Sequence, residues 1–569
     1  MARSLADLSQ GFRQAYLDYA QLTSQLRTWC ETHPTLARLQ SLAKTPEGRD
    51  VWLLTIGPDP DRVRPAVWAD GNLHAAELAG SSVALTIAED ALRAHLEPDS
   101  LDLPRPIIDR MREVLFYIVP RISPDGAECV LKTGRSVRSV PRDERVERGK
   151  PRWIPSDVDG DGLAFAMRVK DPGGELVESP EFAGLLVERT VEDEGPFYKV
   201  YPEGMIEHFD GKTIPSPFFL GDNPIDLNRN FPWFWAPGHE QVGAGPFPTS
   251  EPEARGIVEF TTAHPNIVAW CNYHTFGGVL IRPLGHAPDS KMDQEDLAIF
   301  RQLEQWMTDF TGYPTVSGHD EFLYEPDKPL RGDLSDYAYN QRGAMAYVIE
   351  LWDLFKRLGM ERPPKFAQYY ERVSRADLVK LAWWDKDENE GRSFPPWRPF
   401  DHPQLGPVEI GGIDPRVGIW NPPLHELPQL CASQAQVFVR LAALAPRLRI
   451  ARTERKALPG GLVRVEVKVE NEGYLGSYGL PSAKKLDFNE PLYATATGDL
   501  VDPGMAHQVL GHVDGWGHGL HTGANLPAYP GTRGSTNAAW ATYLVKGGGT
   551  LEVRVGCART GFVTARIEV

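Results

Sequence analysis

The sequence predicts an α/β domain with a mixed central sheet flanked by helices, followed by a small antiparallel β-sandwich. Apolar, strand-like runs alternate with helical patterns up to about residue 350, which is typical of an α/β domain. Period-two alternation in Leu462–Val469 and Thr550–Val555, with Gly-rich turns between such runs, indicates the sandwich. We expect the first domain to span residues 1–444, with an insertion at about 139–222, and the second to span residues 445–569.

The first elements of the chain follow from local patterns. A short helix is expected over Leu22–Thr32, because the dipeptide His33-Pro34 follows and proline ends a helix. Leu36–Ala43 and Val51–Ile56 flank a Pro-Glu-Gly-Arg turn, which predicts a β-hairpin. The apolar run Pro65–Asp70 predicts a buried strand, and it leads into a helical pattern over Leu78–Leu96.

The segment that joins the two domains has a different composition. Residues 392–428 are rich in Pro, Gly and Trp, and we expect an extended segment that wraps the core or leads to the next domain. A helix over Cys431–Leu444 is then expected to close the first domain.

Charge and hydropathy exclude several classes of partner. The net charge of -17 argues against nonspecific nucleic-acid binding. No apolar run is long enough for a transmembrane helix, so no membrane partner is expected. The N-terminus lacks an apolar signal core, which favours the cytoplasm, or secretion if the sequence lacks its leader. The sequence gives no indication of oligomeric state.

Three candidate metal ligands follow two strand-like runs. His74 and Glu77 come directly after Pro65–Asp70, and His274 comes after the run Asn266–Cys271. Open α/β sheets build their sites at the carboxyl ends of strands, so these side chains are expected to meet. Zinc accepts both ligand types and takes three protein ligands in a catalytic site.

Two further motifs fit peptide hydrolysis. Asn228 and Arg229 put an amide beside a guanidinium, and a planar Arg fork binds a carboxylate bidentately. Glu350 ends the apolar run Ala344–Ile349, and a carboxylate there is a candidate general base. Taken singly, either motif is better explained by a surface salt bridge of Arg229 or of Glu350.

The ordered set of motifs resembles the zinc carboxypeptidase family, the metallopeptidases related to carboxypeptidase A. The resemblance covers roughly residues 10–360. It rests on six elements in order: His74-x-x-Glu77, Ser123-Pro124-Asp125-Gly126, Asn228-Arg229, His274, the run from Asp336 to Gln341, and Glu350. Some members carry a transthyretin-like sandwich after the catalytic domain, which supports the second domain by analogy.

The resemblance implies a zinc metallocarboxypeptidase that binds one Zn²⁺ through the three candidate ligands. Glu350 would take a proton from the metal-activated water, and Asn228 with Arg229 would grip the free C-terminal carboxylate of a peptide. Arg138 would stabilise the oxyanion, with Arg135 as a competitor. A related zinc amide hydrolase, acting on non-peptide or cell-wall acyl amino acids, is the alternative. A noncatalytic binding module is disfavoured, because all three ligands and the base are present.

The chain departs from the family pattern around the substrate. The family's mobile tyrosine has no aligned counterpart, and Tyr324 is the nearest candidate. The specificity position falls on Ser335. Asp333 lies in the same loop, Leu330–Asp336, where it could pair with a basic side chain of the substrate or serve as a turn residue. We expect a basic or broad preference rather than a strictly apolar one.

The insertion is the largest departure, and we expect it to form a wall or lid that narrows access to the site. It contains the run Asp157-Val158-Asp159-Gly160-Asp161-Gly162, which resembles the first half of a calcium loop. Position twelve of such a loop should be a Glu, but here it is Arg168. An Asp/Gly turn is therefore favoured over Ca²⁺ at Asp157, Asp159 and Asp161.

Overall fold

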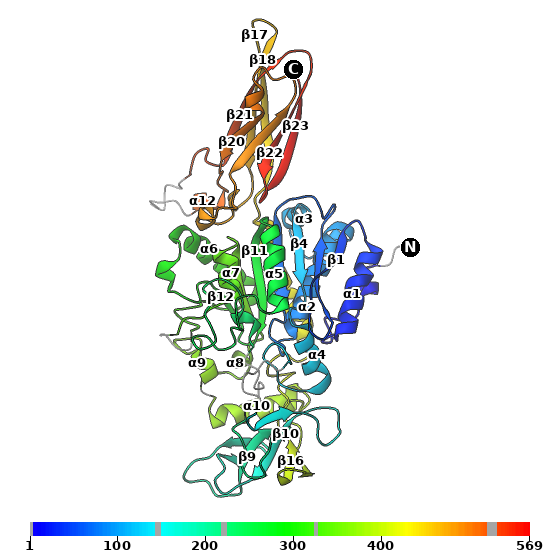
Figure 1. Ribbon diagram of the computed structural model, residues 1–569, viewed down its shortest axis with the longest axis vertical. Coiled ribbons are helices and arrows are strands. Elements are labelled where there is room, and N and C mark those ends of the chain that lie inside the picture. Colours follow the sequence, from blue (N-terminus) through cyan, green and yellow to red (C-terminus); the bar gives the residue numbers. More distant parts are fainter. Residues whose placement is uncertain (1–3, 143–148, 218–224, 324–327, 372, 521–531) are drawn as a thin grey trace.

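The computed structural model describes residues 4–142, 149–217, 225–323, 328–371, 373–520 and 532–569. Figure 1 shows three parts along the long axis of the molecule: an α/β body in the middle, a β-sandwich at one end and a smaller β-region at the other. Within the described residues, no helix combines the length and the apolar character needed to cross a membrane.

The α/β body is built on one eight-stranded mixed sheet, as predicted. The strand order is β1-β2-β4-β3-β11-β14-β12-β13, and the central neighbours β4, β3, β11 and β14 are parallel. Strands β3 and β11 are buried along their whole length, which explains their continuous apolar runs. The strands are β1 Ala37–Lys44, β2 Asp50–Ile56, β3 Ala66–Gly71, β4 Leu115–Val119, β11 Ile267–Thr275, β12 Val279–Arg282, β13 Thr315–Ser317 and β14 Met345–Leu351.

Helices cover this sheet. The α-helices of the body and its neighbouring segments are α1 Tyr19–Thr32, α2 Ala79–Leu96, α3 Arg105–Met111, α4 Pro124–Thr133, α5 Pro252–Ala263, α6 Gln294–Thr311, α7 Leu334–Asn340, α8 Leu354–Arg357, α9 Gln368–Glu371, α10 Arg375–Glu388 and α11 Leu427–Ala443. Short 3-10 turns are η1 Ala6–Leu8, η2 Pro98–Ser100, η3 Leu227–Arg229 and η4 Asp289–Lys291.

The predicted elements of the body are present, with shifted ends. The hairpin of β1 and β2 and the helix α2 are confirmed. Helix α1 begins earlier than expected, at Tyr19, because Asp18 and Gln21 form a capping box there. Helix α11, expected over Cys431–Leu444, begins at Leu427 and packs against α2.

Two glycines let α2 approach the sheet closely. A Cβ atom on Gly80 would lie 2.8 Å from the carbonyl oxygen of Tyr273, and one on Gly71 would lie 2.4 Å from the carbonyl carbon of Gly80. Larger residues would push the helix away from β3 and β11. This contact therefore fixes the loop between β3 and α2, which carries His74 and Glu77.

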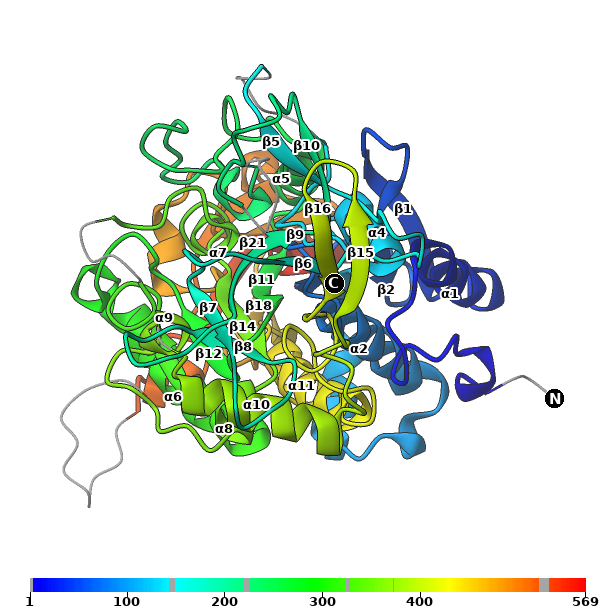
Figure 2. The same ribbon diagram turned by 90° about the horizontal axis from the view of Figure 1, so that it is seen from below.

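The insertion and the Pro-rich segment form one sheet, which the sequence did not predict. Strands β15 and β16 of residues 392–428 form a hairpin, and β16 pairs with β6 of the insertion, in the order β15-β16-β6-β9-β7-β8. Figure 1 shows this region below the central body, and Figure 2 shows the molecule from that end. Its strands are β6 Ala166–Lys170, β7 Leu176–Glu178, β8 Leu186–Glu188, β9 Phe197–Pro202, β15 Arg398–His402 and β16 Gly406–Gly411, with the separate pair β5 Arg152–Pro155 and β10 Gly204–Glu207.

The C-terminal residues form two antiparallel sheets around their own core, as the period-two pattern predicted. Buried valines of β18 alternate with partly exposed residues and pack with β21 and β22. The sheets are β17-β18-β21 and β20-β19-β22-β23. The elements are β17 Leu448–Leu458, β18 Leu462–Asn471, β19 Leu492–Thr497, β20 His507–Gly511, β21 Ala538–Lys546, β22 Thr550–Cys557, β23 Gly561–Glu568, η5 Pro481–Lys485, η6 Pro503–Ala506 and α12 Gly517–Leu520.

The sandwich contacts the α/β body through a buried arginine. The guanidinium of Arg559 donates to the carbonyl oxygens of Ile267 at 3.0 Å and Arg342 at 2.9 Å, and to Asn489 at 3.1 Å. Ile267 opens β11, so the sandwich contacts a strand that carries a candidate ligand at its other end. The domain boundary at residue 444 and the transthyretin-like topology stay predictions.

Candidate zinc centre

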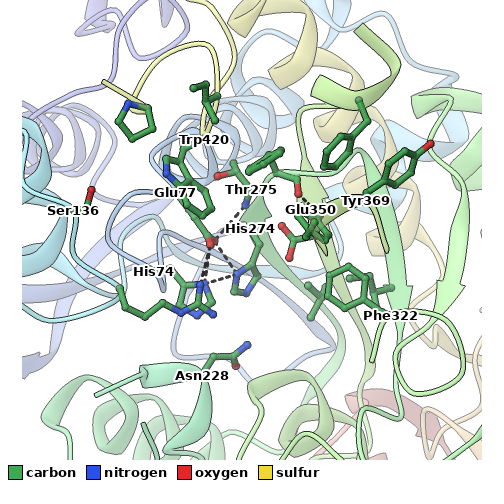
Figure 3. A pocket seen from close by; sticks show the side chains of 18 of the residues that line it. His74, Glu77, Ser136, Asn228, His274, Thr275, Phe322, Glu350, Tyr369 and Trp420 are labelled. Carbon is green, nitrogen blue, oxygen red and sulfur yellow. Dashed lines mark hydrogen bonds and ion pairs between the residues drawn. The ribbon is translucent and has the colours of Figure 1, made fainter. Parts of the chain in front are cut away.

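The three predicted ligands converge on one point (Figure 3). The Nδ1 atoms of His74 and His274 lie 3.1 Å apart, and each lies 2.8 Å from a carboxylate oxygen of Glu77. All three side chains are buried. Their ligand atoms lie within 4.8 Å of one another, so one ion could contact all of them.

The outer nitrogens of the two histidines identify Nδ1 as the ligating atom. Nε2 of His74 faces an Asp226 oxygen at 3.1 Å, and Nε2 of His274 faces Oδ1 of Asn272 at 2.5 Å. Oxygen acceptors favour a proton on each Nε2, which leaves the Nδ1 lone pairs directed toward each other and toward Glu77. Two lone pairs and a carboxylate at this separation repel unless a cation lies between them. The donor set therefore fits zinc.

The charges of the cluster point the same way. Burial alone would raise the pKa of Glu77 and lower the pKa of His274. Their contact reverses both effects: the pKa of Glu77 falls far below its usual range, and the pKa of His274 rises to about 9. The Glu77 carboxylate thus favours a positive charge next to the two histidines, which a bound zinc ion would supply.

Asp226 orients the cluster, and the sequence reasoning missed it. Its carboxylate accepts from His74, from Nε of Arg138 at 3.0 Å and from the backbone N–H of Asn228 at 2.8 Å. Burial would raise its pKa, but the charge of Arg138 and contact with His74 lower it well below the usual range. Its position two residues before Asn228 was the available signal, because it opens the same polar run.

Glu350 lies on the strand next to His274. Strands β11 and β14 are parallel, and their register pairs His274 with Glu350. The Oε2 atom of Glu350 is buried and has no hydrogen-bond partner among the described residues. Burial raises the pKa of this carboxyl to about 8, an effect that Glu77 reinforces and that His274 and Arg138 oppose. A carboxylate beside the ligand cluster, with a buried oxygen that no described residue hydrogen-bonds, has the placement that a general base requires.

The two candidate oxyanion arginines differ in position. Arg138 lines the cavity around the ligands, and besides Asp226 it lies 3.9 Å from a Glu77 oxygen. Arg135 is not among the cavity-lining residues, and its Nε atom has no hydrogen-bond partner within the described ranges. The geometry therefore favours Arg138.

Asn228 and Arg229 lie on η3 and line the same cavity. The Arg229 guanidinium donates to the carbonyl oxygen of Asn228 at 2.7 Å, and Oδ1 of Asn228 accepts from the N–H of Leu334 at 2.9 Å. Gly332 packs tightly here with φ 68°, since a Cβ on it would lie 2.2 Å from the Arg229 carbonyl oxygen. The loop Leu330–Asp336 thus packs against the Asn228–Arg229 pair.

Asp333 and Ser335 line the cavity, but Asp333 also has a structural role. Its Oδ1 accepts from the N–H of Asp336 at 2.9 Å and from the Ser335 hydroxyl, so Asp333 is the N-cap of α7.

Tyr324, the candidate for the family's mobile tyrosine, lies outside the described residues. Tyr369 and Tyr370 line the cavity, and the Tyr370 hydroxyl donates to the carbonyl oxygen of Phe276.

The acidic run of the insertion forms a turn. Asp157 accepts from the N–H groups of Gly160 and Gly162, while Arg398 forms ion pairs with Asp159, at 3.2 Å, and Asp161. Oxygens of Asp157, Asp159 and Glu203 do lie within 4.8 Å of one another. Calcium there stays an untested expectation, and the Arg398 pairs favour the turn.

Comparison with known proteins gives the family. A family model described as zinc carboxypeptidase matches residues 22–159 and 221–372, about half of the chain. A second model, a domain of unknown function (DUF8731), matches residues 447–568. Both the ligand cluster and Glu350 fall within the first match.

Individual relatives match over shorter stretches. The chain is 28% identical over 130 residues to a zinc carboxypeptidase from Saccharothrix mutabilis subsp. capreolus, covering 22% of this chain and 28% of the relative. It is 28% identical over 218 residues to carboxypeptidase A1 from Sus scrofa, covering 35% and 48%. The chain thus spans less than half of the length of these relatives.

Solved structures are similar at low identity. The match to carboxypeptidase A from Helicoverpa armigera has a TM-score of 0.39 and 19% identity, covering 60% of this chain and 67% of that chain. The match to a murein-tripeptide amidase from Escherichia coli O157 has a TM-score of 0.25 and 14% identity, covering 56% and 88%. On the strength of the family model, the chain belongs to the zinc carboxypeptidase family.

Proposed function

We propose that this protein is a zinc-dependent carboxypeptidase that removes residues from the C-terminus of peptides. The observation that carries the proposal is that the three candidate ligands, Glu350 and the Asn228–Arg229 pair line one cavity. Its volume is about 640 Å³. This reaction needs a metal site, a carboxylate that can accept a proton and a cation that binds the substrate carboxylate, and family membership supports the same activity.

The Asn228–Arg229 pair supports action at the chain end. The Arg229 guanidinium would bind the terminal carboxylate bidentately, and the Asn228 amide would donate to it. The loop Leu330–Asp336 packs against η3. Asn228 and Arg229 are therefore held in position before substrate binds. Fixing the carboxylate also fixes the distance from the chain end to the bond that is cut.

Glu350 and Arg138 would carry the proton transfer and the charge stabilisation. When bound, zinc would polarise the scissile carbonyl and lower the pKa of water. Glu350 would accept the proton of the attacking water and pass it to the leaving amine nitrogen. Arg138, held by Asp226, would donate to the carbonyl oxygen as negative charge develops on it.

The cavity wall supports an apolar C-terminal residue, in place of the basic or broad preference expected from the sequence. Ile281, Phe322 and Val348 line the cavity and belong to one apolar cluster. The Asp333 carboxylate is engaged in capping α7, which reduces its capacity to pair with a substrate cation. An apolar side chain would bury surface here without leaving a charge unpaired.

Matched peptides with free and amidated C-termini test exopeptidase character. We expect the zinc-loaded wild type to cleave the free acid strongly in preference to the amide, because the amide cannot pair with Arg229 as a carboxylate does. Arg229→Ala should remove most of this discrimination. Arg255→Ala changes an exposed arginine on α5 and should leave it intact.

Equal wild-type rates on both peptides would contradict the proposal. Retained cleavage of amide-linked compounds that lack a C-terminal carboxylate would instead favour the alternative, a zinc amide hydrolase of non-peptide or cell-wall acyl amino acids.

A further inference from the structure

A segment outside the matched family model forms one wall of the cavity. Residues 413–421, here named the strap, contribute Ile413, Pro415, Ile419 and Trp420 to the lining. The family-model match ends at residue 372, so the strap lies outside it. The Trp420 ring also meets the Phe276 ring edge-on, with centroids 5.3 Å apart.

The strap and the Asn228–Arg229 pair lie on opposite sides of the three candidate zinc ligands. Figure 3 shows Trp420 and Asn228 on opposite sides of the ligand cluster. A substrate whose carboxylate is held at Asn228 has its scissile bond at the ligands. The residues upstream of that bond would lie on the other side of the ligands from Asn228, which is the side where Trp420 lines the cavity.

Buried hydrogen bonds anchor the strap to both halves of the site. Asn421, which is fully buried, donates to the Ala76 carbonyl oxygen at 2.7 Å and accepts from the N–H of Ala79 at 2.9 Å. Ala76 lies between the ligands His74 and Glu77. At the other end of the site, the Trp352 indole, two residues after Glu350, donates to the carbonyl oxygen of Gly418 at 3.2 Å.

Moving the strap aside would leave these groups without partners inside the protein. An unsatisfied buried donor or acceptor costs its full desolvation free energy. Val417 adds a third anchor, because its carbonyl oxygen accepts from Asn389 at 2.9 Å. The strap is thus a fixed wall, and substrate binding would not displace it readily.

The insertion supplies a second wall of the same cavity. Ala164, Phe165 and Ala166 line the cavity. The N–H of Ala164 donates to the Thr133 carbonyl oxygen at 2.7 Å, and the N–H of Phe165 donates to Glu203 at 2.8 Å. Like the strap, these three residues fall outside the family-model match.

We propose that the two walls restrict this enzyme to short substrates: dipeptides, tripeptides and N-acyl amino acids with a free carboxylate. The inference rests on the proposed function and names its substrate class. The cavity volume of about 640 Å³ lies within the range of pockets that bind small ligands. Longer chains would clash with Trp420 or Phe165 upstream of the bond that is cut.

A length series tests this. The substrates share one C-terminal residue and an acylated N-terminus, and differ only in having one, three or seven glycines before the scissile bond. For the zinc-loaded wild type we expect kcat/KM to fall by at least about tenfold from the shortest to the longest, because the walls exclude the longer chains. Trp420→Ala should recover a large part of this loss. Phe165→Ala is the second variant should Trp420→Ala not fold.

Trp540→Ala, which removes an exposed tryptophan of the sandwich, is the matched control and should keep the wild-type length profile. Equal kcat/KM for all lengths in the wild type would overturn the proposal, as would length profiles unchanged in both wall variants.

Calorimetric binding of the same series to Glu350→Gln separates this inference from the proposed function. If the wild type hydrolyses none of the series but affinity still falls with length, the restricted cleft stands and the peptidase function fails. If hydrolysis occurs and affinity does not fall with length, the peptidase function stands and the restricted cleft fails.

Discussion

The ligand cluster and the strap lie on one cavity but have different origins. The cluster is built from side chains next to the ends of neighbouring parallel strands, inside the part of the chain that matches the family model. The strap and the residues 164–166 come from segments outside that match and reach the cavity by long-range packing. The first region carries the chemistry, and the second limits which molecules reach it. Changes in the cluster should therefore abolish turnover, whereas changes in the walls should alter selectivity.

Removal of a ligand should give the largest effect. His274→Ala leaves two of three ligands and an unbalanced buried Glu77, so we expect zinc content to fall far below one ion per chain and activity to fall to background. Elemental analysis of the purified protein measures this. His425→Ala, which changes an exposed histidine, is the matched control. Near-stoichiometric zinc in His274→Ala would show that the ligands lie elsewhere.

Loss of the base should separate chemistry from metal binding. Glu350→Gln keeps the side-chain shape but cannot accept a proton, so we expect kcat to fall by at least about 100-fold. Zinc content should stay at the wild-type level, because Glu350 is not among the clustered ligands. Steady-state kinetics and elemental analysis of the same preparation test both statements. A near wild-type kcat would assign the base to another residue.

Loss of the Asp226 carboxylate should weaken zinc binding without abolishing it. Asp226→Asn removes the charge that holds His74 and Arg138, and we expect zinc affinity to fall by about 10–100-fold. Competition with a chelator measures this affinity. Asp161→Asn, in the exposed turn of the insertion, should have wild-type affinity. An unchanged affinity in Asp226→Asn would mean that Asp226 does not orient His74.

Asp333→Ala should have the smallest effect on activity. Loss of the α7 N-cap should lower the free energy of unfolding by about 1 kcal/mol, while the ranking of C-terminal Phe, Leu, Lys and Arg substrates stays the same. Ser374→Ala removes the N-cap of α10 and provides a matched stability control. If the wild type prefers Lys or Arg and Asp333→Ala abolishes that preference, then Asp333 selects basic residues.

The sequence predicted features that depend on local pattern. His74, Glu77 and His274 could be predicted because each comes after an apolar run, and the carboxyl ends of parallel strands meet at one edge of a sheet. In the structure His74 and Glu77 follow β3, whereas His274 lies within β11, next to its last residue. Strand β18 could be found because its valines alternate. The role of Asp226 was not found, because it depends on a contact with His74 across 152 positions of the chain.

The walls depend even more on distant contacts. Residues 392–428 were expected to be extended, but β16 within them pairs with β6 of the insertion. The sequence pattern of one strand does not indicate which distant strand will pair with it. Asn421 contacts the ligand loop at Ala76, 345 positions away. The sequence is compatible with Asp333 as a specificity residue or as a turn residue, and its role as the N-cap of α7 depends on how the loop folds around the N–H of Asp336.

Mass spectrometry of a mixed library of short peptides, before and after incubation with the zinc-loaded protein, tests the central claim most directly. If zinc at His74, Glu77 and His274 drives carboxypeptidase chemistry with Glu350 as the base, the products will be substrates shortened from the C-terminus by single residues, and Glu350→Gln will leave the library unchanged. Internal cleavage, loss of N-terminal residues, or an unchanged library with zinc-loaded wild type would contradict the account.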